Sequence, residues 1–463
     1  KTEPASKEDP AVVPLADLKR TYAGMGACWA ITVIIVAVSY AAEVSRTSSK
    51  EELILETDES YFMPQSLNDL KVNEWTELRP VGNTKCARGT PFVFFVKRGQ
   101  TGSKKLLIEF MGGGACWSKR TCGLQTAIFS ETAENARRMF RDLPKTVPKK
   151  GDPGASDFVY PYRGIGDVDS PFSNYTHIFV PYCTGDLHWG DNEVQYTESL
   201  KIFHTGGRNA RVVMDWIYSA LPADPELVFV TGCSAGSYGS LMWASHLMNH
   251  YKNKSTKVVQ FGDSGMGVIT GNLGLTALWN VSGQFPFNVI PSNAAAGGNL
   301  SAFQMTEIRS GIFSSLSLPT LYRWIGQANP KHVVSQFSSA YDWNQAFFLK
   351  AMTVGGSARL AEKLKWNSDM KKVYAPGNLS SVPNYYQFVS EGDNHCVILM
   401  NRYWNQRGKM VGSGEQGTFY LSDWVYNITM LKPVPKEVQC PGRCNVGLDV
   451  TDLGNPKIPG SIY

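Results

Sequence analysis

Residues 226–239 read ELVFVTGCSAGSYG, and this stretch decides the fold. Its first part, Leu227 to Val230, is an apolar run typical of a buried strand. A G-x-S-x-G pentapeptide centred on Ser234 follows, and the small residues after it can begin a helix. A serine on a sharp strand-to-helix turn, with its hydroxyl clear of the backbone, is the nucleophile elbow of acyl-transfer enzymes. Gly232 and Gly236 fit this turn because side chains at these two positions would collide. The alternative to a nucleophile elbow is an ordinary glycine-rich turn.

The composition limits the class of protein. The chain has 463 residues, of which 43% are hydrophobic and 12% aromatic, so it can bury one large α/β domain or two smaller ones. The formal net charge is only +5. The basic residues between Arg137 and Lys150 have neither interleaved aromatics nor a nucleic-acid motif. We therefore interpret them as a solvated helix face and loop, and we expect no nucleic-acid partner.

An uncharged apolar segment near the N-terminus predicts a connection to a membrane. Residues 24–42 read GMGACWAITVIIVAVSYAA, and as a helix they would span about 28 Å, enough to cross a bilayer. Lys19 and Arg20 favour a cytoplasmic tail over residues 1–23 and an uncleaved signal anchor. Residues 39–41 have the small-x-small form of a cleavage site, so a cleaved signal peptide is the alternative. Both predict a secretory-pathway protein, either single-pass with a lumenal or extracellular catalytic domain or secreted.

Sequons and cysteines indicate the same compartment. Eight of the nine cysteines lie beyond the apolar segment, and an even number in an oxidising compartment predicts disulfides. No C-x-x-C pair is present and the histidines are not clustered near the cysteines, so we expect no zinc and no cofactor. Asn-x-Ser/Thr sequons, which predict glycosylation, begin at Asn174, Asn253, Asn280, Asn299, Asn378 and Asn427.

Apolar runs and turn signals predict alternating strands and helices. We expect helices over residues 207–221 and after Ser234, and strands at 91–96, 105–111, 177–182, 227–230, 257–261, 333–340 and 385–389. This alternation predicts an α/β fold, with a mostly parallel central sheet and helices on both faces. The expected parts are a stem over residues 43–71, a catalytic domain over 72–432 and a cysteine-containing C-terminal extension over 433–463.

Three glycines directly follow the strand at 105–111, within the segment GGGACW of residues 112–117. A phosphate-binding loop is disfavoured because the Lys-Ser/Thr ending is missing. Bare backbone N–H groups can instead stabilise an oxyanion, as in the glycine motif that precedes the elbow in lipases and esterases. The remaining alternative is a tight turn without a catalytic role.

Ser234 needs an imidazole to take its proton and an acid to orient that imidazole. Only His332 and His395 lie well beyond the elbow helix, where the Ser, acid, His order of α/β-hydrolases places the base. His332 precedes a strand, whereas His395 follows one and so lies at the carboxyl edge, which favours His395. For the acid, Asp263 and Asp342 both follow strands, and the residues alone leave both open.

Four segments, GGGACW, GCSAGSYGS, YDWNQ and DNHC, together resemble the pectin acetylesterase and Notum carboxylesterase family of the α/β-hydrolase fold. The resemblance spans roughly residues 75–404, and the form TKCARGTPFVFFV followed by LIEFMGGGACW is closest to the bacterial-type branch. It implies Ser234 as the nucleophile, His395 as the base and Asp342, rather than Asp263, as the acid.

The resemblance also implies the oxyanion donors, the backbone N–H groups of Gly113, Gly114 and Ala235. One departure concerns Gly114, because animal Notum proteins place an aromatic residue there. Among the cysteines, Cys86 with Cys183 is implied by the resemblance, while short separations favour Cys116 with Cys122 and Cys440 with Cys444. That leaves Cys233 and Cys396 as a pair or as buried thiols.

These observations predict a serine carboxylesterase without metal or cofactor. By resemblance, its substrate is an acylated carbohydrate, and the reaction removes O-acetyl groups from a polysaccharide. A Notum-like deacylase acting on a lipid-modified protein is the alternative within the class. A non-catalytic binding module at the cell surface is the alternative from another class.

Overall fold

The computed structural model describes residues 62–141, 164–268, 275–290, 317–353, 360–374, 379, 382–410, 417–440 and 444. The chain separates into two compact units, Lys1–Ser60 and Tyr61–Tyr463, and every described residue belongs to the second. The predicted tail, the apolar segment at 24–42 and most of the stem lie outside the described residues. Within the described ranges, every helix is too short or too polar to span a bilayer.

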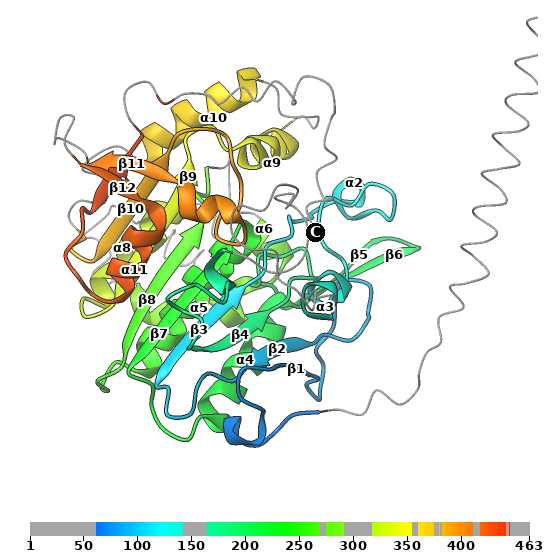
Figure 1. Cartoon of the computed structure of the whole chain (residues 1–463). Helices are drawn as coiled ribbons and strands as arrows, with labels where there is room; N and C mark the ends of the chain where they lie inside the picture. The colour runs from blue at the N-terminus through cyan, green and yellow to red at the C-terminus, as the bar shows by residue number, and fades with distance from the viewer. Residues whose placement is uncertain are drawn as a thin grey trace, which may run out of the picture. The chain divides into compact units, whose positions relative to one another are not determined.

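One eleven-stranded sheet organises the second unit (Figure 1). The seven strands from β4 (Thr176–Val180) to β13 (Glu437–Gln439) in the spatial order run parallel, whereas β2 (Phe94–Lys97) and β11 (Arg407–Met410) pair antiparallel with the strands beside them. The predicted α/β fold with a mostly parallel sheet is therefore confirmed. In spatial order the strands are β1 (Trp75–Leu78), β2 (Phe94–Lys97), β4 (Thr176–Val180), β3 (Lys105–Phe110), β7 (Leu227–Cys233), β8 (Lys257–Asp263), β9 (Val333–Ser339), β10 (Tyr385–Ser390), β13 (Glu437–Gln439), β11 (Arg407–Met410) and β12 (Thr418–Tyr420).

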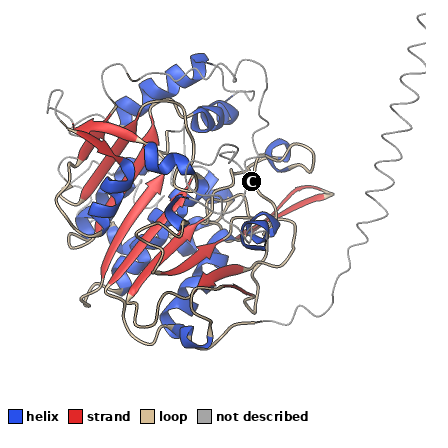
Figure 2. Cartoon of the chain, viewed as in Figure 1, coloured by secondary structure: helices blue, strands red, loops and turns tan. Residues whose placement is uncertain are grey.

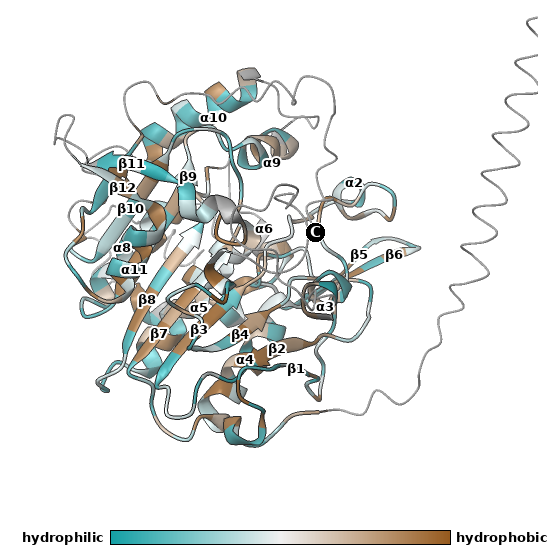
Figure 3. Ribbon diagram, in the orientation of Figure 1, coloured by the Kyte–Doolittle hydropathy of each residue, from teal (hydrophilic) through white to brown (hydrophobic). Residues whose placement is uncertain are grey.

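The central strands are buried along nearly their whole length. Every residue of β4, β7 and β9 is buried, as is every residue but the first of β3 and β8. In Figure 3, apolar residues gather most clearly on β3 and β7. Such continuous burial is typical of parallel strands whose two faces are both covered. A separate antiparallel hairpin, β5 (Asn192–Thr197) and β6 (Leu200–His204), lies outside this sheet.

Helices cover both faces of the sheet (Figure 2). Gln260 of β8 donates a hydrogen bond to Ser240 of α5 (Ala235–His250), whereas the adjacent Phe261 packs against Trp424 of α11 (Leu421–Thr429). Successive strand residues point to opposite faces, so α5 and α11 cover opposite sides. The other α-helices among the described residues are α2 (Lys119–Cys122), α3 (Glu134–Arg141), α4 (Gly206–Ala220), α6 (Leu275–Leu278), α8 (Leu318–Ala328), α9 (Trp343–Thr353) and α10 (Leu360–Val373).

The carboxyl edge of the parallel strands gathers the residues proposed for catalysis. Ser234 directly follows β7, Asp263 ends β8, Asp342 follows β9, and His395 lies in the segment after β10. His332 instead precedes the first residue of β9, at the opposite edge. Asp342 and His395, the proposed partners of Ser234, thus lie at the same edge of the sheet as Ser234.

Four disulfides cross-link the described unit, namely Cys86–Cys183, Cys116–Cys122, Cys233–Cys396 and Cys440–Cys444. The three expected pairs are confirmed, and Cys233 with Cys396 forms a fourth pair rather than two thiols. Disulfides persist in oxidising compartments, which places this unit in the secretory pathway. The sequon residues Asn174, Asn253 and Asn280 are exposed, Asn427 is half-buried, and Asn299 and Asn378 lie outside the described residues.

The sheet reaches into the expected C-terminal extension. β13 pairs in parallel with β10, and the buried Val438 lies opposite Phe388. Trp424 donates its indole N–H to the carbonyl of Pro435, which ties the connecting segment to α11. The start of the segment at 433–463 therefore supplies a strand of the central sheet, because Val438 is buried beside Phe388 of β10.

Candidate active site

Ser234 sits on a strained turn between β7 and α5. Its backbone φ and ψ are 54° and −122°, a sparsely populated region for a residue with a Cβ atom. A Cβ on Gly232 would lie 2.6 Å from the backbone carbonyl carbon of Gly236, and one on Gly236 would collide with the Phe110 carbonyl oxygen. The flanking glycines thus have the predicted steric role. Ser234 itself remains half-exposed, as the geometry of a nucleophile elbow requires.

A buried imidazole and carboxylate face each other beside this turn. The Nδ1 atom of His395 lies 2.9 Å from both Oδ1 and Oδ2 of Asp342. Asp342 is fully buried, and its Oδ1 also accepts hydrogen bonds from the backbone N–H groups of Asn344 and Gln345, each at 3.0 Å. These donors hold the carboxylate in one orientation. The arrangement fixes the proton of His395 on Nδ1 and leaves Nε2 available as a base.

The second candidate acid, Asp263, has different partners. Its Oδ1 accepts from the hydroxyl of Ser264 at 2.7 Å, and its Oδ2 accepts from the backbone N–H of Ile398 at 2.8 Å. Burial raises the pKa of this carboxyl to about 6, although both hydrogen bonds and His395 oppose that shift. Of the two carboxylates that the residues alone left open, Asp342 is the one in contact with the imidazole.

The other candidate histidine is occupied elsewhere. The Nδ1 atom of His332 accepts a hydrogen bond from the backbone N–H of Val258 at 3.0 Å. On the elbow helix, His246 contacts the carbonyl of Gln284, and His250 stacks on a tyrosine ring. These contacts agree with the choice of His395 over the other histidines.

The glycine segment begins next to the elbow. Phe110, the last residue of β3, pairs with Gly232 of β7, so the glycines leave the sheet beside Ser234. Among the hydrogen bonds of the described residues, the N–H groups of Gly113 and Gly114 donate none. The N–H of Ala235 opens α5, where no preceding helical carbonyl is available. Among the described residues, none of these three backbone N–H groups has a hydrogen-bond acceptor, so the predicted role as oxyanion donors stays open to them.

Gly114 has a backbone that tolerates no side chain. Its φ is +76°, and an added Cβ would collide with the carbonyl oxygen of Ile128. The oxyanion role predicted for Gly114 implies that replacing it with alanine should displace the loop and lower kcat for the test ester p-nitrophenyl acetate by about 10²- to 10³-fold, the usual loss for one oxyanion donor. Steady-state kinetics should show a smaller change in KM.

Gly102→Ala is the matched control for this prediction. Gly102 also has a positive φ, +83°, but an added Cβ there would have nothing within 4 Å. It lies in the turn between β2 and β3, so kcat should stay within about twofold of the native value. Equal losses in the two variants would mean that backbone strain, rather than a misplaced donor, explains the Gly114 result.

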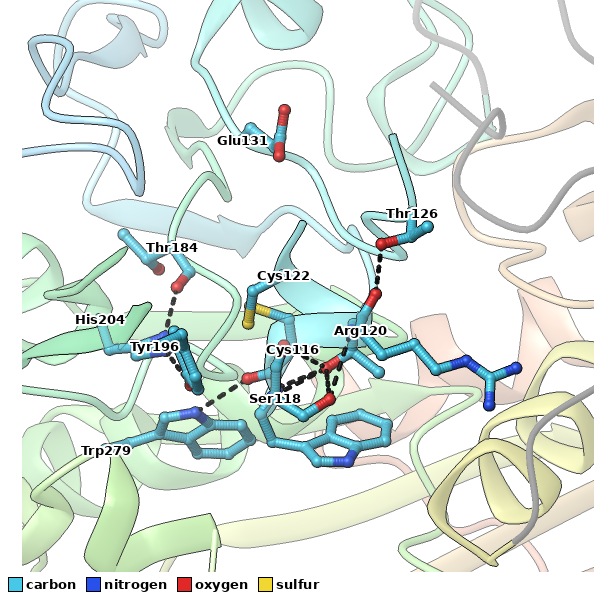
Figure 4. Close-up of a disulfide and its surroundings, with 12 residues drawn as sticks. Cys116, Ser118, Arg120, Cys122, Thr126, Glu131, Thr184, Tyr196, His204 and Trp279 are labelled. Atoms are coloured by element: carbon cyan, nitrogen blue, oxygen red, sulfur yellow. Dashed lines mark hydrogen bonds between the residues drawn. A yellow bond between two sulfur atoms is a disulfide. The ribbon is translucent and has the colours of Figure 1, made fainter. Parts of the chain in front are cut away.

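A small disulfide loop follows the glycine segment (Figure 4). Cys116, bonded to Cys122, donates its N–H to the carbonyl of Gly185 at 2.9 Å. The Cys116 carbonyl accepts from the indole N–H of Trp279 at 3.1 Å. The loop is therefore anchored to two neighbouring segments, which restrains the glycines before it.

The same loop brings two sulfur atoms close to an imidazole. Cys116, Cys122 and His204 place potential ligand atoms within 4.8 Å of one another. Both sulfurs belong to the disulfide, so neither is a thiolate. His204 contacts the carbonyl of Thr184 through Nδ1 and the hydroxyl of Tyr196 through Nε2, each at 2.9 Å. These atoms are already engaged and do not form a metal site.

His188 and Gln345, which the sequence did not single out, make hydrogen bonds that support the site. Burial lowers the pKa of His188 to about 4, so its ring is neutral at pH 7, and its Nε2–H donates to the Met111 carbonyl at 2.9 Å. The Gln345 side chain donates to Asp342 at 2.9 Å and accepts from the backbone N–H of Met266 at 2.8 Å. Gln345 lies at the start of α9, within the YDWNQ segment quoted above, and His188 lies in the segment after β4, so the signal for His188 was its position at the carboxyl edge alone.

Comparison with known proteins finds a matching family, similar sequences and a similar solved structure. The model of the pectinacetylesterase family matches residues 76–272. Pectin acetylesterase 5 of Arabidopsis thaliana is 21% identical over 406 residues, which cover 82% of this chain and 85% of that protein. Palmitoleoyl-protein carboxylesterase notum2 of Xenopus laevis is 27% identical over 202 residues, which cover 42% of this chain and 38% of that protein. The solved structure of the Wnt deacylase Notum from Drosophila aligns with 81% of this chain and 98% of that chain, at 16% identity and a TM-score of 0.49.

The mostly parallel sheet and the strained serine after β7 define the class, which is that of α/β-hydrolase-like proteins. Within this class, residues 76–272 match the pectinacetylesterase family, and the chain is similar to both pectin acetylesterases and Notum carboxylesterases. It is a carboxylic ester hydrolase that removes acyl groups, which favours the enzyme over a non-catalytic binding module. The resemblance to a bacterial-type branch stays a prediction.

Proposed function

We propose that this protein is a serine esterase in which Ser234, His395 and Asp342 form the catalytic triad and the substrate is an O-acetylated polysaccharide. One observation carries the proposal. The contact between His395 and Asp342 lies at the sheet edge that also presents the strained Ser234, and the residues next to Ser234 and His395 are joined by the Cys233–Cys396 disulfide.

In the proposed reaction, the Ser234 hydroxyl attacks the ester carbonyl and transfers its proton to Nε2 of His395. The carbonyl oxygen becomes an oxyanion and accepts hydrogen bonds from the free N–H groups of Gly113, Gly114 and Ala235. Collapse of this intermediate breaks the ester bond, and His395 returns the proton to the leaving alcohol. A water molecule, deprotonated by His395, then attacks the acyl enzyme and releases the carboxylic acid and Ser234.

The similarity to pectin acetylesterase 5, which extends over 82% of this chain, supports acetyl as the acyl group. The similarity to notum2 makes a palmitoleoyl group on a protein the second candidate.

A panel of p-nitrophenyl esters tests the acyl group. For an acetylesterase, kcat/KM should fall by more than about tenfold from acetate to octanoate, since one methylene is worth about 1–3 kcal/mol in a fitted pocket. The rate of acetate release from acetylated pectin, measured with an enzymatic acetate assay, should exceed the rate at which palmitoleic acid is released from a palmitoleoylated peptide. Faster cleavage of octanoate and of the palmitoleoyl peptide would instead assign this chain to the deacylase function.

We also infer that residues 24–42 anchor the protein in the membrane, with the catalytic unit on the lumenal or extracellular side. The length of this apolar segment and the four disulfides beyond it support the topology. Extraction of membranes with alkaline carbonate should leave an anchored protein in the pellet and release a secreted one.

A further inference from the structure

One disulfide joins the two residues that adjoin the proposed nucleophile and base. Cys233 precedes Ser234 and Cys396 follows His395, although 163 residues separate the two cysteines in the sequence. Their Cα atoms lie 5.2 Å apart, and both residues are buried, with 1% and 2% exposure. The backbones that carry Ser234 and His395 are therefore covalently held side by side.

The segment that carries His395 has little regular structure of its own. Residues 391–397 are neither helix nor strand, and they include positive φ values at Gly392 (87°) and Cys396 (59°). Helix and sheet hydrogen bonds, which fix Ser234 through β7 and α5, are thus absent over this described stretch. The position of the His395 backbone depends on individual ties to its neighbours.

The end of β8 supplies part of those ties. The Asp263 carbonyl accepts from the backbone N–H of Ser234 at 2.8 Å, while the Asp263 side chain accepts from the N–H of Ile398 at 2.8 Å. The hydroxyl of Ser264 accepts from the N–H of Cys396 at 3.2 Å. The β8 end therefore lies between the elbow and the histidine segment and contacts both, and the disulfide closes this arrangement covalently.

We propose that the Cys233–Cys396 disulfide is a positioning cross-link that keeps Nε2 of His395 within reach of the Ser234 hydroxyl, an inference that rests on the proposed function. The contact with Asp342 orients the imidazole through Nδ1 but does not tie His395 to the elbow. Only the disulfide and the β8 end make that connection among the contacts described above. Of the four disulfides in the described residues, this is the one that adjoins triad residues.

The double variant C233A/C396A removes the cross-link without leaving a free thiol. With p-nitrophenyl acetate, kcat should fall by about 10- to 100-fold while KM changes by less than about threefold, because a displacement of about 1 Å between reacting groups costs up to about 10²-fold in rate. The variant C440A/C444A, which removes a disulfide distant in sequence from the triad, should keep kcat within about twofold of the native value.

A double-mutant cycle with His395→Ala separates positioning from general structural support. If the disulfide acts by placing His395, its removal should change the residual rate of H395A by less than about twofold, although it slows the native enzyme. An equal loss in both backgrounds, or a native kcat in C233A/C396A, would overturn the inference. A native rate in H395A itself would instead overturn the proposed triad, so the two failures are distinguishable.

The isosteric pair C233S/C396S repeats the test if the alanine pair does not fold. Its hydroxyls can hydrogen-bond across the same gap but leave the two backbones without a covalent link, so kcat should still fall, by less than the roughly 10- to 100-fold expected for the alanine pair. Loss of soluble protein in both pairs, with C440A/C444A soluble, would assign the bond a role in folding and overturn the positioning role.

Discussion

Replacing Ser234 with alanine should lower kcat for p-nitrophenyl acetate by about 10⁴- to 10⁶-fold, the range found when a serine nucleophile is removed from a triad. The physical reason is that the variant has no group at the elbow able to form the acyl enzyme. The backbone N–H donors would remain, so KM should change little. Steady-state kinetics and loss of covalent labelling by a fluorophosphonate both measure the effect.

Ser237→Ala is the matched control. Ser237 lies in the first turn of α5, is 1% exposed, and its hydroxyl has no hydrogen-bond partner among the described residues. Removing an unpartnered hydroxyl leaves no group unsatisfied, so kcat and the melting temperature should stay close to the native values. A Ser234→Ala protein that retained both activity and labelling would show that the nucleophile lies elsewhere.

Much of the fold could be predicted because the central strands are buried on both faces. Lys257 to Phe261 and Tyr385 to Val389 stand out as apolar runs, and the structure places β8 and β10 there with small shifts at their ends. β13 gave no such signal. It has three residues and one buried side chain, Val438, and its neighbour β10 is distant in sequence.

The acid could not be chosen from the residues alone because Asp263 and Asp342 share the same local signature. Each ends or follows a buried parallel strand, and β8 and β9 are adjacent, so both carboxylates emerge at one edge. What distinguishes them is tertiary. The Asp263 side chain contacts the N–H of Ile398, three residues beyond His395, whereas Asp342 contacts the imidazole itself.

The pairing of Cys233 with Cys396 could not be predicted either, because it also depends on tertiary structure. A disulfide requires Cα atoms within about 7 Å of each other, and no local pattern reports that distance for residues on β7 and after β10. The steric role of Gly232 and Gly236 could be predicted, in contrast, because the elbow is a local structure whose backbone conformation follows from its motif.

Replacing Asp342 with asparagine should lower kcat by about 10⁴-fold, because the wrong histidine tautomer would be favoured. Asp342 Oδ1 accepts from two backbone N–H groups, and Oδ2 accepts from the Gln345 side chain. An asparagine that keeps its oxygen toward the backbone donors must turn its NH₂ group toward His395. Nδ1 would then become the acceptor, the ring proton would move to Nε2, and His395 could no longer take the proton of Ser234.

Asp263→Asn distinguishes the orienting acid from a carboxylate that supports the loop. An asparagine at this position can still accept from the N–H of Ile398 and donate to the Ser264 hydroxyl, so kcat should fall by less than about tenfold. Both variants should fold, since each substitution preserves side-chain shape, and their melting curves test that expectation. If Asp263→Asn were the variant that lost about 10⁴-fold and Asp342→Asn stayed active, the acid would have to be reassigned to Asp263, and the observed contact of His395 with Asp342 would have no catalytic role.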